Sequence, residues 1–226
     1  MDQNLFAQKI LLFFKNLKIP SPLPKGIDVL NPYLHPEAFA LCEQFYNQYY
    51  ADSKPRKIII GINPGRFGAG LTGIPFTDPI KLQEVCGINN ALPKKAELSA
   101  DFIYRMIQAY GGPINFYKNF YFSSVSPLGF TKNGKNLNYY DDKNLTEQLL
   151  PFIHSCMTRQ LNFGIDTKAA YCLGEGENFK FLSKLNAQHR FFENLIPLAH
   201  PRFIMQYKRK KLNHYIDQYI QAFHHS

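Results

Sequence analysis

The chain reads KIIIGINPGRFGAGLTGIPF from Lys57 to Phe76. Ile58–Ile60 is a short run of β-branched residues, a pattern typical of a buried strand. Four glycines and two prolines follow Gly61, so the chain can neither extend this strand nor start an ordinary helix there. Because a bare backbone lets a ligand approach main-chain N–H groups closely, the stretch predicts a binding loop at the end of a strand.

This glycine-rich loop is not a P-loop, because it lacks the terminal Gly-Lys-Ser or Gly-Lys-Thr that such a loop requires. Its most informative polar side chain is the amide of Asn63, at the carboxyl end of the strand. Open α/β sheets place their ligands at this edge. A structural turn, in which Asn63 caps its own backbone, is the alternative interpretation.

Composition narrows the class of protein. The chain has 226 residues, of which 45% are hydrophobic and 19% charged, and we expect one domain over residues 1–226, with helices of residues 1–52 packed on its core. The formal net charge of +9 favours a polyanionic partner such as nucleic acid. No segment is long enough to span a bilayer, so we expect no membrane partner.

The first residues and the cysteines indicate a reducing compartment. Residues 1–17 predict an amphipathic surface helix, because Asp2 and Lys9 interrupt the apolar run that a signal peptide would need. No Cys-x-x-Cys pair occurs, so we expect no metal, cluster or other cofactor, and reduced thiols in a cytoplasmic protein. The cysteines are Cys42, Cys86, Cys156 and Cys172.

Predicted helices alternate with predicted strands, which indicates an α/β fold: a three-layer α/β/α sandwich around a mostly parallel, four-stranded sheet. The strands are expected at 57–62, 119–125, 168–173 and 194–198. The helices are expected at 6–17, 36–50, 99–110, 146–163, 175–186 and 213–223, with an irregular stretch from the glycine-rich loop to residue 93.

This order brings polar residues together from three strand ends. Asn63 follows the first strand, Ser124 and Ser126 lie at the end of the second, and His200 follows the fourth. The carboxyl ends of parallel strands share one edge of the sheet, so these side chains are expected to line one pocket.

The loop and the histidine together resemble the two motifs of a known enzyme family. Gly61–Gly65 with Gly73–Phe76 is similar to the first motif of the single-strand-selective monofunctional uracil-DNA glycosylases, in the bacterial-type branch of the uracil-DNA glycosylase superfamily. His200-Pro201-Arg202 resembles the second motif. The segments 99–102, 126–128, 134–137 and 147–150 match in order and spacing, so the resemblance covers roughly residues 55–215.

The resemblance implies hydrolysis of the bond between a deaminated base and deoxyribose in DNA. The base must be extruded into a pocket, where Phe76 would be the stacking floor and main-chain N–H groups of Ile62–Gly65 would bind base carbonyl oxygens. A neutral His200 would donate to a base carbonyl oxygen as negative charge develops. Asn63 would hold the attacking water. No Schiff-base lysine is implied, so the product is an abasic site.

The segment after the histidine is the expected DNA contact. Arg202, Phe203, Ile204 and Met205, within the stretch 202–207, are the candidate wedge that unstacks the strand. A basic run follows and would bind phosphates, the alternative being a solvated helix start. This run is Lys208, Arg209, Lys210 and Lys211.

One residue departs from the family's usual pattern. Ser124 stands where an asparagine normally reads the uracil edge, and a hydroxyl cannot make the same bidentate contact. Xanthine or hypoxanthine is therefore a further candidate substrate besides uracil. A catalytically silent nucleic-acid-binding module and a hydrolase of free nucleosides or nucleotides remain as alternative functions. We expect a monomer.

Overall fold

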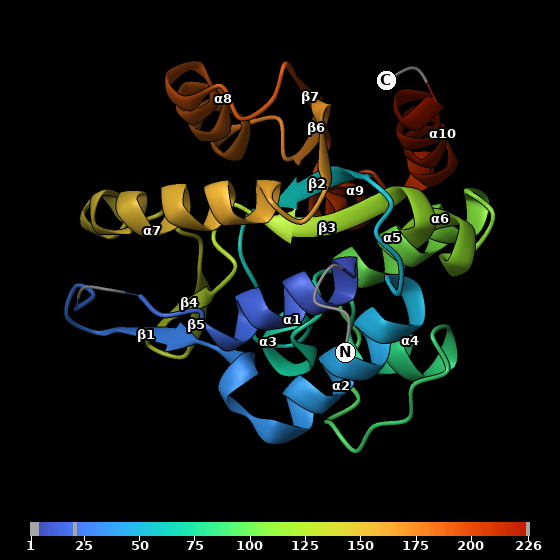
Figure 1. The fold of residues 1–226 in the computed structure, drawn as a ribbon, viewed down its shortest axis with the longest axis horizontal. Helices are drawn as coiled ribbons and strands as arrows, with labels where there is room; N and C mark the ends of the chain where they lie inside the picture. Colours follow the sequence, from blue (N-terminus) through green and yellow to red (C-terminus); the bar gives the residue numbers. More distant parts are fainter. Residues whose placement is uncertain (1–4, 20–21, 225–226) are drawn as a thin grey trace.

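The centre of the molecule is a sheet of four parallel strands in the order β3-β2-β6-β7 (Figure 1). The computed structural model describes residues 5–19 and 22–224. The predicted sheet is confirmed, and all four of its strands run in the same direction. They are β2 (Arg56–Gly61), β3 (Phe120–Ser124), β6 (Ile165–Leu173) and β7 (Asn194–Leu198).

The register of the sheet aligns the carboxyl ends of its strands. Gly61, the last residue of β2, pairs with Ser124, the last residue of β3. Leu173 at the end of β6 pairs with Leu198 at the end of β7. The loops that leave these ends therefore start from one edge of the sheet, where open α/β folds bind ligands.

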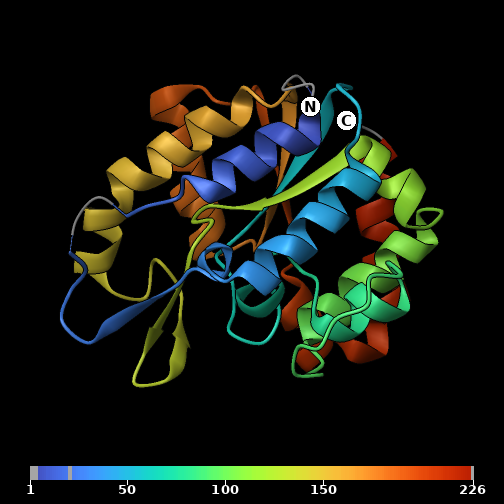
Figure 2. The same ribbon diagram turned by 60° about the horizontal axis from the view of Figure 1, so that its bottom comes forward.

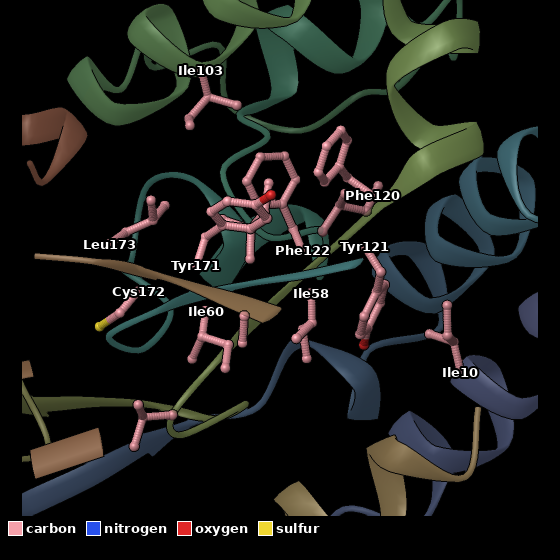
Figure 3. Close-up of a cluster of buried hydrophobic side chains, with 14 of the residues drawn as sticks. Ile10, Ile58, Ile60, Ile103, Phe120, Tyr121, Phe122, Tyr171, Cys172 and Leu173 are labelled. Atoms are coloured by element: carbon pink, nitrogen blue, oxygen red, sulfur yellow. The ribbon is translucent and has the colours of Figure 1, made fainter. Parts of the chain in front are cut away.

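Helices cover both faces of the sheet, and side chains alternate between these faces along each strand. In Figure 3, Ile58, Ile60 and Tyr121 lie on the side of α1, whereas Phe120 and Phe122 lie on the side of α5. The main helices are α1 (Phe6–Lys15), α2 (Pro36–Tyr49), α5 (Leu98–Ala109), α6 (Pro113–Asn119), α7 (Lys143–Leu161), α8 (Glu177–His189), α9 (Pro201–Tyr207) and α10 (Leu212–His224).

A second, smaller sheet was not predicted from the sequence. It is antiparallel, has the order β1-β4-β5, and projects as a hairpin at the lower left of Figure 2. Its strands have only three or four residues, too few to show a clear apolar alternation. They are β1 (Ile27–Leu30), β4 (Gly129–Lys132) and β5 (Lys135–Leu137).

The amphipathic helix predicted at the start of the chain is present as α1, packed on the core with Leu12 and Lys15 exposed. Within α1, Phe6 and Ile10 are completely buried, and Phe6 stacks on Tyr50 with 5.6 Å between ring centroids. The apolar side of the helix faces the core, as expected of an amphipathic helix. Residues 1–4 of this prediction lie outside the described part of the chain.

Four helices occupy stretches where none was predicted. Proline at the first helical position starts α6, α9 and the short helix α4 (Pro79–Glu84), because its fixed φ suits that position. The fourth, α3 (Ala69–Thr72), is one turn inside the glycine-rich loop and ends at Gly73, which has a φ of 72°. The stretch from the loop to residue 93 is thus more regular than expected.

Within residues 5–19 and 22–224, no helix has the length and apolarity that crossing a bilayer requires. All four cysteines are free and buried.

Candidate active site

A cavity of about 110 Å³ lies at the carboxyl edge of the parallel sheet. Asn63 and His200, which are 137 positions apart in the sequence, both line it, as does Phe76. The other lining residues are Ile62, Pro64, Gly65, Ala69, Pro75, Glu97, Ser99, Ser124, Asn136, Asn138 and Arg202. The geometry therefore joins the ends of β2, β3 and β7 in one pocket.

The amide of Asn63 is held in place by backbone groups at the end of β5 and just after it. Its Nδ2 donates to the carbonyl oxygen of Leu137 at 3.2 Å, and its Oδ1 accepts from the N–H of Tyr139 at 2.9 Å. A carbonyl oxygen has two lone pairs, so Oδ1 retains one acceptor position. Asn63 is thus an oriented acceptor on the cavity wall. Its two shorter hydrogen bonds are to backbone outside its own turn, and Nδ2 also donates to the carbonyl oxygen of Pro64, within the turn, at 3.4 Å.

His200 is neutral, with its proton on the nitrogen available to a ligand. The Nδ1 of His200 accepts the backbone N–H of Arg202 at 3.2 Å, as the cap of α9, so a neutral ring carries its hydrogen on Nε2. Burial, followed by the positive charge of Arg202, lowers the pKa of His200 from 6.5 to about 4. At neutral pH the side chain is therefore a neutral N–H donor.

Phe76 lies against the bare backbone of β2. A Cβ built on Gly61 would be only 2.6 Å from the Cζ of Phe76, so the ring occupies the space that a glycine leaves. Phe76 has a φ of 56°, which is uncommon for a bulky residue and occurs in turns and at functional sites. The ring is partly exposed and its other neighbour is Phe122, at 5.3 Å between centroids.

The two predicted serines differ in position. Ser124 lines the cavity at the end of β3. Ser126 does not: it is fully buried, and its hydroxyl donates to the carbonyl oxygen of Leu128 at 2.7 Å. The prediction that Ser126 binds the base is therefore wrong, because the turn after β3 directs its side chain into the protein.

Ile62 and Gly65 of the glycine-rich loop, both predicted to bind the base, line the cavity. Within it, Gly68, Gly70 and Gly73 have the Gly-x-Gly-x-x-Gly spacing of dinucleotide-binding turns. In such a turn the glycines lead from the strand directly into a full helix, whereas here α3 has only four residues. The loop is therefore not of that type.

The residues after His200 form a helix, and only one side of it is exposed. Arg202 and Phe203 face solvent, and Phe203 is 42% exposed. Ile204 and Met205 are buried, so the prediction that they wedge into DNA is wrong. Helical spacing places these two on the inner side of α9, whereas Tyr207, one turn after Phe203, is 66% exposed.

A groove adjoins the cavity and continues it along α9. Arg202 and His200 line both, and Phe203 and Tyr207 line the groove alone. The basic run Lys208–Lys211 follows, and all four of its side chains are exposed. These positions give the site a cationic end beside an aromatic surface.

Four polar residues of the cavity were not predicted as site residues: Glu97, Ser99, Asn136 and Asn138. Asn136 accepts the backbone N–H of Arg66 at 3.1 Å and so connects the small sheet to the glycine-rich loop. Ser99 and Asn136 lie in segments that take part in the family resemblance, which was the only signal for them. Nothing in the sequence pattern marks Glu97.

Two comparisons with known proteins, together with this cavity, identify the chain as an N-glycosylase of DNA. The chain belongs to the uracil-DNA glycosylase superfamily: the model of the "Uracil DNA glycosylase superfamily" matches residues 48–224. Among solved structures, wild-type Pedobacter heparinus SMUG2 is 49% identical and has a TM-score of 0.95, with 97% of each chain covered. No curated protein matches the chain. The resemblance to single-strand-selective monofunctional uracil-DNA glycosylases is thus confirmed.

Proposed function

We propose that this enzyme extrudes a deaminated base from DNA into the cavity, hydrolyses its N-glycosidic bond and leaves an abasic site for base excision repair. The observation that supports this most directly is the shared cavity of Asn63 and a neutral His200. A base within a duplex is out of reach, so the nucleotide must leave the stack before it enters.

The proposed reaction separates departure of the base from attack by water. The C1′–N bond breaks first, and its electron pair leaves with the base. The Nε2–H of His200 donates to a base carbonyl oxygen and stabilises the negative charge as it develops. The free acceptor position of Asn63 Oδ1 orients a water toward the sugar cation. Phe76 supports the plane of the base, and N–H groups between Ile62 and Gly65 bind its carbonyl oxygens.

Release of uracil from a single-stranded oligonucleotide tests the proposal. We expect an alkali-labile abasic strand from the wild-type protein under single-turnover conditions. Binding of the oligonucleotide without base release would support the silent binding module instead. Turnover of free deoxyuridine without any oligonucleotide would support a nucleoside hydrolase.

The substrate range is proposed to include hypoxanthine or xanthine, because Ser124 leaves more room at the base edge than an asparagine would. We expect Ser124→Asn to raise the ratio of uracil to hypoxanthine release about tenfold, the effect of refilling a pocket by a few atoms. Single-turnover rates on the two substrates measure this ratio. Ser126→Ala is the matched control, because its hydroxyl lies outside the cavity and the ratio should not change. An unchanged ratio in Ser124→Asn would contradict the broadened pocket.

DNA is proposed to lie along α9 and the basic run, with Arg202, Phe203 and Tyr207 beside the extruded nucleotide. We expect replacement of Lys208, Arg209, Lys210 and Lys211 by glutamine to flatten the dependence of log affinity on log salt. The slope should fall by about 0.7 for each lost contact with a single-strand phosphate. Titration of a labelled oligonucleotide at several salt concentrations measures it. The control combines Lys54→Gln, Lys118→Gln and Lys168→Gln, which lie toward the opposite edge of the sheet; an equal change there would contradict the assignment.

A further inference from the structure

Glu97 is fixed at the wall of the active-site cavity by its own backbone. It is the residue that precedes α5, and its N–H donates to Oδ2 of Asp78 at 2.9 Å. The other oxygen of Asp78 accepts the N–H of Lys81 at 2.8 Å and caps α4. Two helix starts are thus joined through one buried carboxylate, which holds Glu97 at the cavity that Asn63 and His200 share.

The carboxyl group of Glu97 occupies the space that the glycine-rich loop leaves open. A Cβ built on Gly68 would be 1.9 Å from its Oε2, and one built on Gly65 would be 3.1 Å from its Oε1. Side chains at these two positions would exclude the carboxyl group. In the described part of the chain, no hydrogen bond or ion pair occupies its oxygens. A carboxyl group without a partner at a ligand cavity is available to a ligand.

Burial and the charge of Asp78 favour the protonated form of Glu97. Burial, and then the negative charge of Asp78, raise the pKa of Glu97 from 4.5 to about 7, against the opposing effect of Arg202 on α9. His200, on the same cavity, is neutral. The guanidinium of Arg66 in the loop is bonded to the carbonyl oxygen of Gly134 instead.

The acidic residue of α5, Asp101, also forms its ion pairs with groups other than Glu97. Asp101 pairs with Lys81 at 3.6 Å and with Arg105 at 3.1 Å. Because the pKa of Glu97 is about 7, its side chain is partly protonated and partly ionised at neutral pH. A general acid works best when its pKa lies near the pH of the reaction.

The cavity walls leave one edge of a bound base for Glu97. In the proposed function, Phe76 supports the face of the base, Ser124 meets its pairing edge, and Asn63 and His200 are at the sugar side. The wall formed by Gly65, Ala69 and Glu97 is then opposite the third edge. In a purine, this third edge carries N7, a ring nitrogen that accepts a proton, whereas uracil has only carbon atoms at the corresponding positions.

We propose that Glu97 is a catalytic residue for purine substrates, contacting N7 of an extruded hypoxanthine or xanthine and protonating it as the glycosidic bond breaks. This inference rests on the proposed function, and it extends that function to a group the uracil reaction does not need.

The proposed step balances as a hydrolysis. The carboxyl proton moves to N7, the C1′–N9 bond breaks, and its electron pair stays on N9, so the purine leaves as a neutral N7–H tautomer. Water adds to C1′ of the sugar cation and loses one proton. That proton returns to the Glu97 carboxylate, which restores the acid.

The test compares Glu97→Gln with wild type in single-turnover release of hypoxanthine and of uracil from the same single-stranded sequence, between pH 5 and 9. Glutamine keeps the shape but cannot transfer a proton. We expect hypoxanthine release to fall about a hundredfold in the variant, the usual effect of losing a general acid, and uracil release to stay within threefold. In the wild type, hypoxanthine release should decline above pH 7 and uracil release should not.

Glu175→Gln is the matched control, because Glu175 is an exposed carboxylate of the neighbouring groove and lies outside the cavity. It should leave the ratio of the two rates unchanged. Three results would overturn the role of Glu97 and leave the glycosylase proposal intact. In two of them, Glu97→Gln slows the release of both bases equally, or releases both at the wild-type rate. In the third, the wild-type protein releases uracil but no purine. A wild-type protein that releases neither base would overturn both.

Discussion

His200→Ala is expected to slow uracil release by about a hundredfold to a thousandfold at saturating enzyme, the usual effect of removing one donor to a developing oxyanion. The backbone N–H of Arg202 holds Nδ1 of His200, so the Nε2–H is the only hydrogen that the neutral ring can offer. Alanine removes this donor, and it also removes the side-chain cap at the start of α9. Single-turnover kinetics on a uracil-containing single strand measure the loss.

Arg202→Ala is the control for this prediction. It removes a charge beside the imidazole but keeps the backbone N–H that fixes the tautomer, so it should weaken DNA binding and leave the rate at saturation nearly unchanged. A loss of rate at saturation as large as that of His200→Ala would contradict the role of His200 as the donor.

The pH dependence of uracil release follows from the same group. The folded-state pKa of His200 is lowered to about 4, so the neutral form persists as pH falls through 6.5 and is lost only near pH 4. We therefore expect a level rate from pH 9 to about pH 5 and a decline below. A decline centred near 6.5 would show that an ordinary, solvated histidine controls the reaction.

The sequence predicted those parts of the site that sit directly at strand ends. Ile58–Ile60 is an unbroken apolar run, so the strand could be placed, and the parallel order then located Asn63 and His200 at one edge. The direction of a side chain in the turn that follows a strand could not be predicted in this way. The hydroxyl of Ser126, two residues past the end of β3, points inward and donates to the carbonyl oxygen of Leu128, although Ser124 at the strand end lines the cavity.

Long-range packing explains the remaining differences. Ile204 and Met205 look like an apolar wedge in the sequence, but once Pro201 starts a helix, their spacing directs them to the core. Glu97 precedes an ordinary helix, and only its approach to Gly65 and Gly68 makes it a cavity residue. No local pattern records a contact between segments about thirty positions apart, so composition and periodicity could not reveal it.

Asn63→Ala should reduce uracil release by about a hundredfold or more, because it removes both the acceptor that orients the water and the connection from the β2 loop to the chain after β5. Asn63→Asp separates these effects. An aspartate can still accept from the N–H of Tyr139, but it cannot donate to the carbonyl oxygen of Leu137, so we expect it to recover only part of the rate. Thermal unfolding of both variants shows whether the protein remains folded.

The leaving group distinguishes Asn63 from His200. Fluorine at C5 makes uracil a better leaving group, so bond cleavage depends less on a donor to the base. The deficit of His200→Ala should therefore shrink on 5-fluorouracil, since that donor acts on charge that the fluorine already stabilises. The deficit of Asn63→Ala should stay the same, because the oriented water stabilises the positive charge that develops on the sugar, and this charge is the same whichever base departs. Equal shrinkage in both variants would contradict the assignment of Asn63 to the water, and would place both residues on the departing base.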